Sequence, residues 1–129
     1  MYRLRVLVAV DHDELRNVVV SLLGAEFQVI GAVGDGEQLV EAAFLFQPDV
    51  IVSDIDMPIM GGFDARDELL ARNIHYPFVF ITIMRIAIAS TVEEGPVGYV
   101  HKTDIAEELK PAVHSVARGR FYASRLFRE

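Results

Sequence analysis

Five short apolar runs, separated by segments with helical periodicity, are the feature of this sequence that most constrains its fold. Residues 15–23, between the first two runs, place their apolar side chains at the three- and four-residue spacing of one helix face. Strands that alternate with helices predict a parallel sheet in an α/β domain, and strands that are apolar throughout are typical of a sheet covered on both faces. The five runs lie at residues 4–10, 27–33, 50–52, 78–83 and 98–101.

The same pattern predicts where helices end and how the chain divides. Gly24 is expected to end the first helix and Gln47-Pro48 the second, because glycine and proline interrupt helices.

We predict one domain over residues 1–120, and a C-terminal tail or the start of a linker over residues 121–129. The expected helices are residues 15–23, 37–46, a segment containing Phe63, Leu69 and Leu70, a weak helix at 86–93 and a last helix at 105–118.

The composition is that of an acidic globular protein. Of the 129 residues, 52% are hydrophobic and 24% are charged, which supports a buried core and argues against long disorder. The net charge of −7 disfavours a nucleic-acid-binding surface and favours a metal cation or a basic partner. The absence of cysteine excludes disulfides and thiolate metal sites. No apolar stretch is long enough for a signal-peptide core or a membrane span, so we expect a soluble, cytoplasmic protein.

Polar side chains follow the apolar runs where the strands are expected to end. In a parallel α/β sheet these ends meet at one edge, which is where ligands bind. Carboxylates can hold Mg²⁺, and a lysine and a hydroxyl can bind phosphoryl oxygens. The set therefore predicts transfer of a phosphoryl group to a carboxylate that is both nucleophile and metal ligand, for which Asp54 is the candidate. The residues are Asp11 after the first run, Asp54 and Asp56 after the third, Thr82 in the fourth and Lys102 after the fifth.

Several of these residues also have an ordinary structural explanation. A threonine in an apolar strand, such as Thr82, is more often bonded to backbone at the edge of the core, and a single loop lysine is usually solvated. Asp13 is expected to cap the first helix rather than to bind metal. The four histidines lack a metal-binding spacing. The chemical interpretation is favoured because four suitable residues end four different strands.

Three segments resemble the receiver domain of response regulators in two-component signalling. Residues 48–58 read PDVIVSDIDMP and are followed by Gly61-Gly62, which matches the family's PD, apolar run, D-x-x-MP and glycine. Residues 98–102, GYVHK, match its G-Y-x-x-K, and residues 34–37, GDGE, are similar to its second turn. The resemblance covers about residues 4–120. It implies a flavodoxin-like (βα)5 doubly wound sandwich, with a five-stranded parallel sheet in the order 2-1-3-4-5.

The resemblance also assigns roles at the sheet edge. It places Asp54 at the phosphoacceptor position, Thr82 at the hydroxyl that follows the phosphoryl group, and Lys102 at the lysine of the site. It makes Asp11 a direct metal ligand, and Asp56 a ligand through its backbone carbonyl. The implied cofactor is Mg²⁺.

Two features are similar to the NarL/FixJ-type subfamily, namely Asp11-His12 and the Thr103-Asp104 that follows Lys102 in place of proline. Those proteins usually carry a DNA-binding output domain after the receiver. The resemblance therefore implies DNA contact only through a separate domain that this chain does not include. It implies a sensor histidine kinase as partner, allows a homodimer, and predicts a signalling switch rather than an enzyme, without membrane contact. Tyr99 corresponds to the aromatic residue that rotates inward on activation.

Three departures from the family pattern affect the expected chemistry. Val10 occupies the first of two acidic positions, so one carboxylate of the metal site is missing and Mg²⁺ binding is expected to be weak. Ile83 follows Thr82 where the family has a small residue. The segment between Thr82 and Lys102 is slightly short for the family.

Three functions remain in competition. The first is a receiver that accepts a phosphoryl group on Asp54 from a histidine kinase and switches a partner surface or an output domain, with transcriptional regulation as the expected output. The second is a pseudo-receiver that binds protein without phosphorylation, which Val10 and Ile83 favour and the Asp54, Thr82 and Lys102 set disfavours. The third is a small flavodoxin-like enzyme or nucleotide binder, which the absence of a phosphate-binding glycine motif disfavours.

Overall fold

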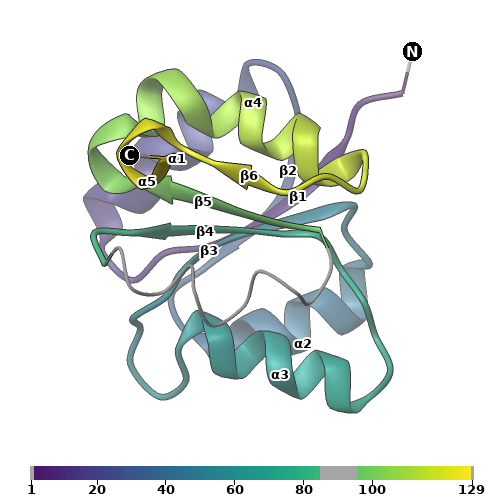
Figure 1. Cartoon of the computed structure of the whole chain (residues 1–129). Coiled ribbons are helices and arrows are strands. Elements are labelled where there is room, and N and C mark those ends of the chain that lie inside the picture. The colour runs from purple at the N-terminus through teal and green to yellow at the C-terminus, as the bar shows by residue number, and fades with distance from the viewer. Residues whose placement is uncertain (1, 85–95, 129) are drawn as a thin grey trace.

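The computed structural model describes residues 2–84 and 96–128, which form a three-layer α/β sandwich (Figure 1). A parallel sheet of six strands, in the order β2-β1-β3-β4-β5-β6, forms the middle layer. Helices α1 and α4 cover one face, and α2 and α3 cover the other. The strands are β1 (Arg5–Ala9), β2 (Gln28–Val33), β3 (Val50–Asp54), β4 (Phe78–Thr82), β5 (Val97–His101) and β6 (Tyr122–Ala123). The helices are α1 (Asp13–Gly24), α2 (Gly36–Phe46), α3 (Gly62–Ala71), α4 (Ile105–Ala117) and α5 (Arg125–Arg128).

The flavodoxin-like fold and the strand order 2-1-3-4-5 are confirmed, and a sixth strand extends the predicted sheet. The segment predicted as a tail or the start of a linker contains this strand, β6, and the short helix α5. β6 pairs with β5 through Gly98–Tyr122 and Tyr99–Ala123. A two-residue strand has no alternation of apolar and polar side chains, so periodicity could not detect it.

The boundaries of α2 illustrate how the local sequence positions the elements. The Asp35 carboxylate accepts a hydrogen bond from the backbone N–H of Gln38 at 2.8 Å, which caps the first turn. Gln47 ends the helix in the left-handed conformation, with φ of 49°, and Pro48 follows. The Arg5 guanidinium donates to the backbone carbonyls of Phe46 and Gln47, so β1 holds the end of α2.

Two apolar clusters, one on each face of the sheet, form the core. Val6, Val8 and Val10 face α1 and α4, whereas Leu7 and Ala9 face α2 and α3. This alternation along one buried strand is expected because successive side chains point to opposite faces. Both clusters end at the carboxyl edge of the sheet, which leaves that edge for polar chemistry.

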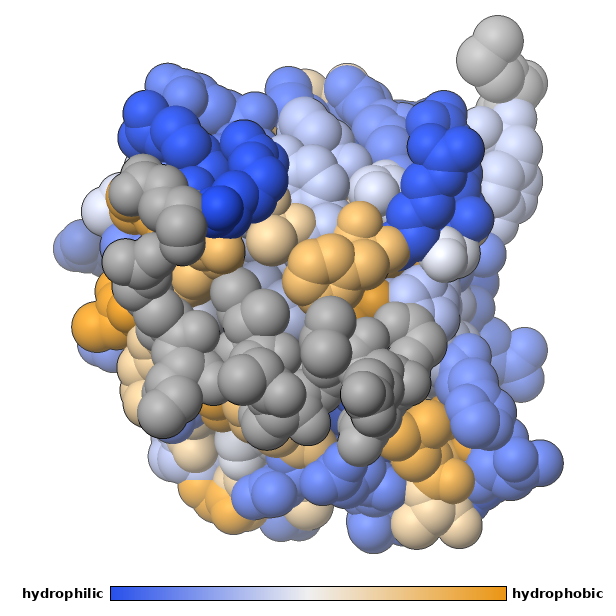
Figure 2. All heavy atoms as spheres, viewed as in Figure 1, coloured by the Kyte–Doolittle hydropathy of each residue, from blue (hydrophilic) through white to orange (hydrophobic). Residues whose placement is uncertain are grey.

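The surface of the β6 side has hydrophilic and hydrophobic areas. In Figure 2 the α4 side is mostly hydrophilic, and hydrophobic surface lies near the level of the sheet.

No helix in the described part of the chain has the length and hydrophobicity needed to cross a membrane. The weak helix predicted at residues 86–93 lies outside the described residues.

Candidate functional site

The carboxyl ends of four neighbouring strands bring the predicted residues to one edge of the sheet. Asp54 is the last residue of β3 and pairs with Ile81 of β4. Thr82, the last residue of β4, pairs with His101 of β5, and Lys102 follows His101 directly. The site is therefore assembled by strand register rather than by a long loop.

Asp54 is a buried carboxylate with two close partners. Its relative exposure is 1%. The Lys102 Nζ lies 3.3 Å from Oδ1, and the backbone N–H of Asp11 donates to Oδ2 at 3.3 Å. Oδ1 pairs with the Lys102 ammonium and makes no hydrogen bond of ordinary geometry with the described residues. A buried acceptor left in this state is suited to a cation or to a newly formed covalent bond.

The environment of Asp54 raises the pKa of its carboxyl group. Burial disfavours the ionised form and is the largest cause, whereas the Lys102 charge and the Asp11 N–H lower the pKa and only partly oppose it. The site thus combines a buried carboxylate with a cation that can meet an incoming anionic group.

We expect Asp54→Asn to stabilise the metal-free protein at pH 7. In the folded protein the pKa of Asp54 lies above the ordinary value of 3.8, so the protonated side chain is favoured by folding. The contribution of Asp54 to the free energy of unfolding is therefore fully present below pH 3.8 and is lost as the pH rises through the folded-state pKa. Asparagine never ionises, so it avoids this loss. Urea unfolding in EDTA from pH 3 to pH 8 should show a gain for the variant near neutrality that disappears in acid. Asp67→Asn, an exposed site, is the charge-matched control; an equal gain there would contradict the prediction.

Thr82 is buried beside the site, and its hydroxyl is already in use as an acceptor. Its exposure is 3%, and Oγ1 accepts a hydrogen bond from the backbone N–H of Met84 at 2.9 Å. The predicted bond to backbone is therefore present. It does not exclude the phosphoryl role, because the hydroxyl hydrogen can still be donated. Ile83, whose side chain is 65% exposed, lies on the surface next to this hydroxyl.

The predicted metal ligands occupy different environments. Asp11 is half-buried beside Asp54, whereas the Asp56 side chain is exposed and lines a surface pocket of about 310 Å³ with Met57 and Asp64. Within residues 2–84 and 96–128, no group of three or more histidine, aspartate or glutamate side chains is placed to hold a metal ion. The expected set has two carboxylates and a backbone carbonyl, so Mg²⁺ binding stays a prediction. The hard oxygen donors and the buried Oδ1 of Asp54 fit that ion.

Val10, at the position where the family resemblance implies an acidic residue, is a core residue in this structure. It is fully buried in the cluster that faces α1 and α4. Its backbone N–H donates to the carbonyl of Val33 at 3.0 Å, and its carbonyl accepts from the Arg16 guanidinium at 2.9 Å. An apolar side chain is therefore well placed here, and the site has one carboxylate fewer.

Arg16 is a site residue that the sequence reasoning did not identify. Its guanidinium contacts the carbonyls of Val10 and Asp11 and pairs with the Asp13 carboxylate at 2.6 Å, so it fixes the loop that carries Asp11. The prediction that Asp13 caps α1 was wrong, because His12 is the N-cap residue and makes no side-chain cap. The spacing of three residues between Asp13 and Arg16 is the signal that could have indicated their pairing.

Tyr99, the predicted switch aromatic, points inward in this structure. Its ring is fully buried, stacks on Phe80 at 5.8 Å between centroids, and contacts the ring of Phe121 at 6.1 Å. Tyr99 therefore joins the centre of the sheet to the segment that contains β6.

Comparison with known protein families agrees with the fold. The family model described as the response regulator receiver domain matches residues 6–114. The chain belongs to the response regulator receiver domain family. This match includes Asp11, Asp54, Thr82 and Lys102.

Individual relatives carry response-regulator names. The transcriptional regulatory protein PdtaR of Mycobacterium tuberculosis is 32% identical over 120 residues, which cover 91% of this chain and 58% of that protein. The nitrate/nitrite response regulator NarL of Escherichia coli is 29% identical, over 92% of this chain and 57% of that protein. The chain thus spans a little over half the length of these relatives.

Solved structures show the same fold. The receiver domain of the putative response regulator NarL from Mycobacterium tuberculosis is 26% identical, with a TM-score of 0.84 over 93% of this chain and all of that chain. A LuxR-family response regulator from Aurantimonas has a TM-score of 0.90 over 98% of this chain and 94% of that chain, at 21% identity, which supports the fold alone. The match to the Aurantimonas structure extends over almost the whole of this chain.

Proposed function

We propose that this chain accepts a phosphoryl group on Asp54 from a sensor histidine kinase and thereby switches a protein surface. The observation that carries the proposal is the buried Asp54 carboxylate, whose Oδ1 lies 3.3 Å from Lys102 Nζ and makes no hydrogen bond of ordinary geometry with the described residues. Membership of the receiver family supports the same role. Receiver domains are signalling modules, so the reaction serves the switch rather than the turnover of a metabolite.

The geometry suggests how the residues divide the work. A carboxylate oxygen of Asp54 attacks phosphorus, the bond from phosphorus to the kinase's histidine nitrogen breaks, and that nitrogen keeps the electron pair. The Lys102 ammonium, already beside Oδ1, is placed to pair with a phosphoryl oxygen. The Thr82 hydroxyl, held by the N–H of Met84, can donate to another. The Asp11 N–H restrains Oδ2 during the attack.

A divalent cation is part of the proposal. Asp11 and Asp54, with the backbone carbonyl of Asp56, would hold Mg²⁺. When bound, the ion offsets the negative charge of the phosphoryl oxygens. Because Val10 contributes no carboxylate, we expect binding to be weaker than a site with two adjacent acids would give.

The decisive experiment is incorporation of phosphate from acetyl phosphate with Mg²⁺, followed by intact mass. The wild-type chain should gain one phosphoryl group, and Asp54→Asn should gain none. Asp56→Asn is the matched control, since it changes a neighbouring acid and keeps the backbone carbonyl. Labelling that persists in Asp54→Asn would disprove the assignment of the acceptor.

The competing pseudo-receiver predicts a different result in the same experiment. A wild-type chain that gains no phosphate at any Mg²⁺ concentration would favour binding without phosphorylation, for which the buried Val10 is the structural argument. The paired Asp54 and Lys102 favour the phosphorylated switch.

We further propose transcriptional regulation as the output. The relatives include proteins named as transcriptional regulators, and this chain spans a little over half of their length. DNA contact would therefore come from parts outside this chain. The cytoplasmic location and a homodimer stay predictions; size-exclusion chromatography with and without phosphorylation would test the second.

A further inference from the structure

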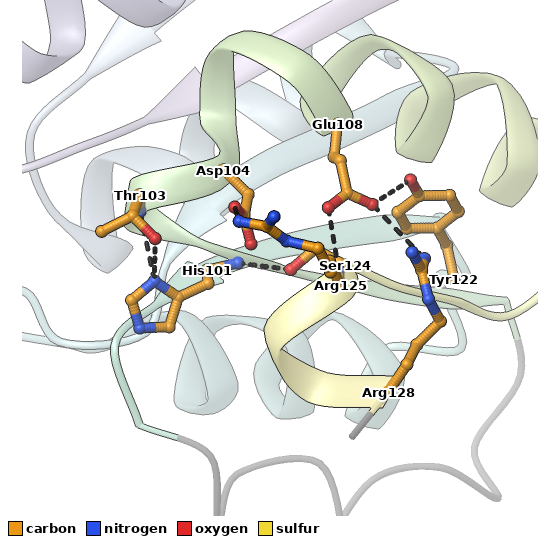
Figure 3. Close-up of polar contacts among 8 residues, drawn as sticks. All are labelled: His101, Thr103, Asp104, Glu108, Tyr122, Ser124, Arg125 and Arg128. Atoms are coloured by element: carbon orange, nitrogen blue, oxygen red, sulfur yellow. Dashed lines mark hydrogen bonds and ion pairs between the residues drawn. The ribbon is translucent and has the colours of Figure 1, made fainter.

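The segment that contains β6 and α5 is attached to the strand that leads to Lys102. Ser124 makes the direct connection (Figure 3). Its backbone N–H donates to the carbonyl of Tyr99 at 2.8 Å, and its Oγ accepts from the backbone N–H of His101 at 2.9 Å. Ser124 is fully buried, so water does not compete for these bonds. Ser124 thus continues the pairing of β5 up to the last residue of that strand.

His101 lies between Ser124 and the reactive groups. On one side its backbone pairs with Thr82 of β4, and on the other its N–H is held by Ser124. The next residue is Lys102, whose Nζ lies 3.3 Å from Asp54 Oδ1. The His101 ring contacts the Thr103 hydroxyl at 2.8 Å, so the turn after β5 is also restrained. A displacement of His101 would therefore move Lys102, the residue that pairs with the Asp54 carboxylate.

The rest of the segment is anchored to α4 through Glu108. This carboxylate accepts hydrogen bonds from the Tyr122 hydroxyl at 2.7 Å and the Arg125 backbone N–H at 2.8 Å, and it pairs with Arg128 at 3.3 Å (Figure 3). Burial raises the pKa of Glu108, but these bonds and the Arg128 charge outweigh it and hold the pKa below its usual value. Glu108 therefore stays ionised and fixes the segment from a second side.

We propose that Ser124 is a positioning residue for phosphoryl transfer, which acts through the backbone of His101 to set where Lys102 meets Asp54. The inference rests on the proposed function and extends the set of positioning residues to Ser124. A strand end bonded on both sides samples fewer positions than one bonded on a single side. Misplacement of a reacting group by about 1 Å can cost as much as ~100-fold in rate, so a small change at His101 is sufficient.

The first test does not require phosphorylation. The chain contains two lysines, Lys102 and Lys110, so an amine-reactive reagent reports the access of Lys102 against an internal reference on α4. Ser124→Ala should raise the Lys102 to Lys110 labelling ratio roughly threefold, because a loosened ion pair leaves Nζ accessible more often. Asp54→Asn, which removes the partner, should raise the same ratio.

Three further variants separate positioning from general stability. Ser124→Thr keeps the hydroxyl and should restore the wild-type ratio. Tyr122→Phe is the matched control, since it removes a hydrogen bond from the same segment to Glu108 and leaves His101 untouched. If Ser124→Ala fails to fold, as shown by a joint rise in labelling at both lysines, Ser124→Cys provides a side chain of similar size and weak acceptor strength.

The second test measures phosphorylation. With acetyl phosphate and Mg²⁺, Ser124→Ala should react roughly tenfold more slowly than the wild type, and Tyr122→Phe at the wild-type rate. An unchanged labelling ratio in a folded Ser124→Ala, or an equal change in Tyr122→Phe, would overturn the inference. A wild-type chain that takes no phosphate would defeat the proposed function instead, and the labelling ratio would still decide the role of Ser124.

Discussion

Gly62→Ala is expected to destabilise the folded chain by about 3 kcal/mol and to slow phosphorylation at Asp54. A Cβ at Gly62 would lie 2.2 Å from the backbone carbonyl oxygen of Asp54 and 2.8 Å from the Ser53 Oγ. Both atoms belong to the end of β3, which is paired on both sides and has no room to move away. The clash therefore transmits to the backbone that carries the acceptor.

Gly24→Ala is the matched control for this prediction. Gly24 is the last residue of α1, and a Cβ there would meet no heavy atom within 4 Å. Alanine restricts the unfolded chain and is the better helix former, so this variant should gain about 0.5 kcal/mol. Chemical denaturation of both variants gives the comparison. A loss of less than about 1 kcal/mol in Gly62→Ala would show that the β3–α3 connection adapts to a methyl group.

The pairing of Asp54 with Lys102 could be predicted from the sequence because each residue follows a distinct apolar run. Residues 50–52 lie in the central strand β3 and residues 98–101 in β5, two strands further along the sheet, and the first charged residues after them, Asp54 and Lys102, meet at 3.3 Å. Strand ends in a parallel sheet share one edge, so the pattern determines the neighbourhood without knowledge of any distance. The resemblance to the family motif then indicated which of the carboxylates is the expected phosphoacceptor.

Ser124 and β6 could not be predicted for a physical reason. The contribution of Ser124 depends on one buried hydroxyl that accepts from a backbone N–H 23 residues earlier in the chain. Neither composition nor periodicity reports such a contact, because the two β6 residues are too few to show alternation. A short strand of this kind is defined by tertiary context, namely the open edge of β5 and the carboxylate of Glu108.

Val10 shows what the structure adds to an assignment made from the sequence. The sequence indicated a missing acid, and the structure shows a fully buried valine whose backbone is bonded on both sides. The valine thus contributes to the hydrophobic core as well as removing charge from the site.

Val10→Asp is expected to lower the stability of the metal-free protein by about 3 kcal/mol or more at pH 7, because it brings an unpaired carboxylate into the core. Val10→Asn is the matched control for the charge, since asparagine has the same shape as aspartate and cannot ionise. The aspartate variant should therefore be the less stable of the two at neutral pH, in unfolding measured with EDTA present.

Addition of Mg²⁺ should change this order if Val10 lies at the acidic position of a metal site. The new carboxylate would join Asp11 and Asp54 as an oxygen donor or hold a coordinated water, and outer-shell support of that kind typically changes metal affinity ~10–100-fold. A ligand that binds only the folded state stabilises it by an amount that grows with its concentration over its dissociation constant. In a Mg²⁺ titration of Tm, Val10→Asp should thus respond at lower Mg²⁺ than the wild type, and Val10→Asn should respond as the wild type does or less. Equal Mg²⁺ dependence in all three proteins would show that the side chain at position 10 points only into the core cluster around Val6 and Val8, and that the loss of the acid is not what weakens the site.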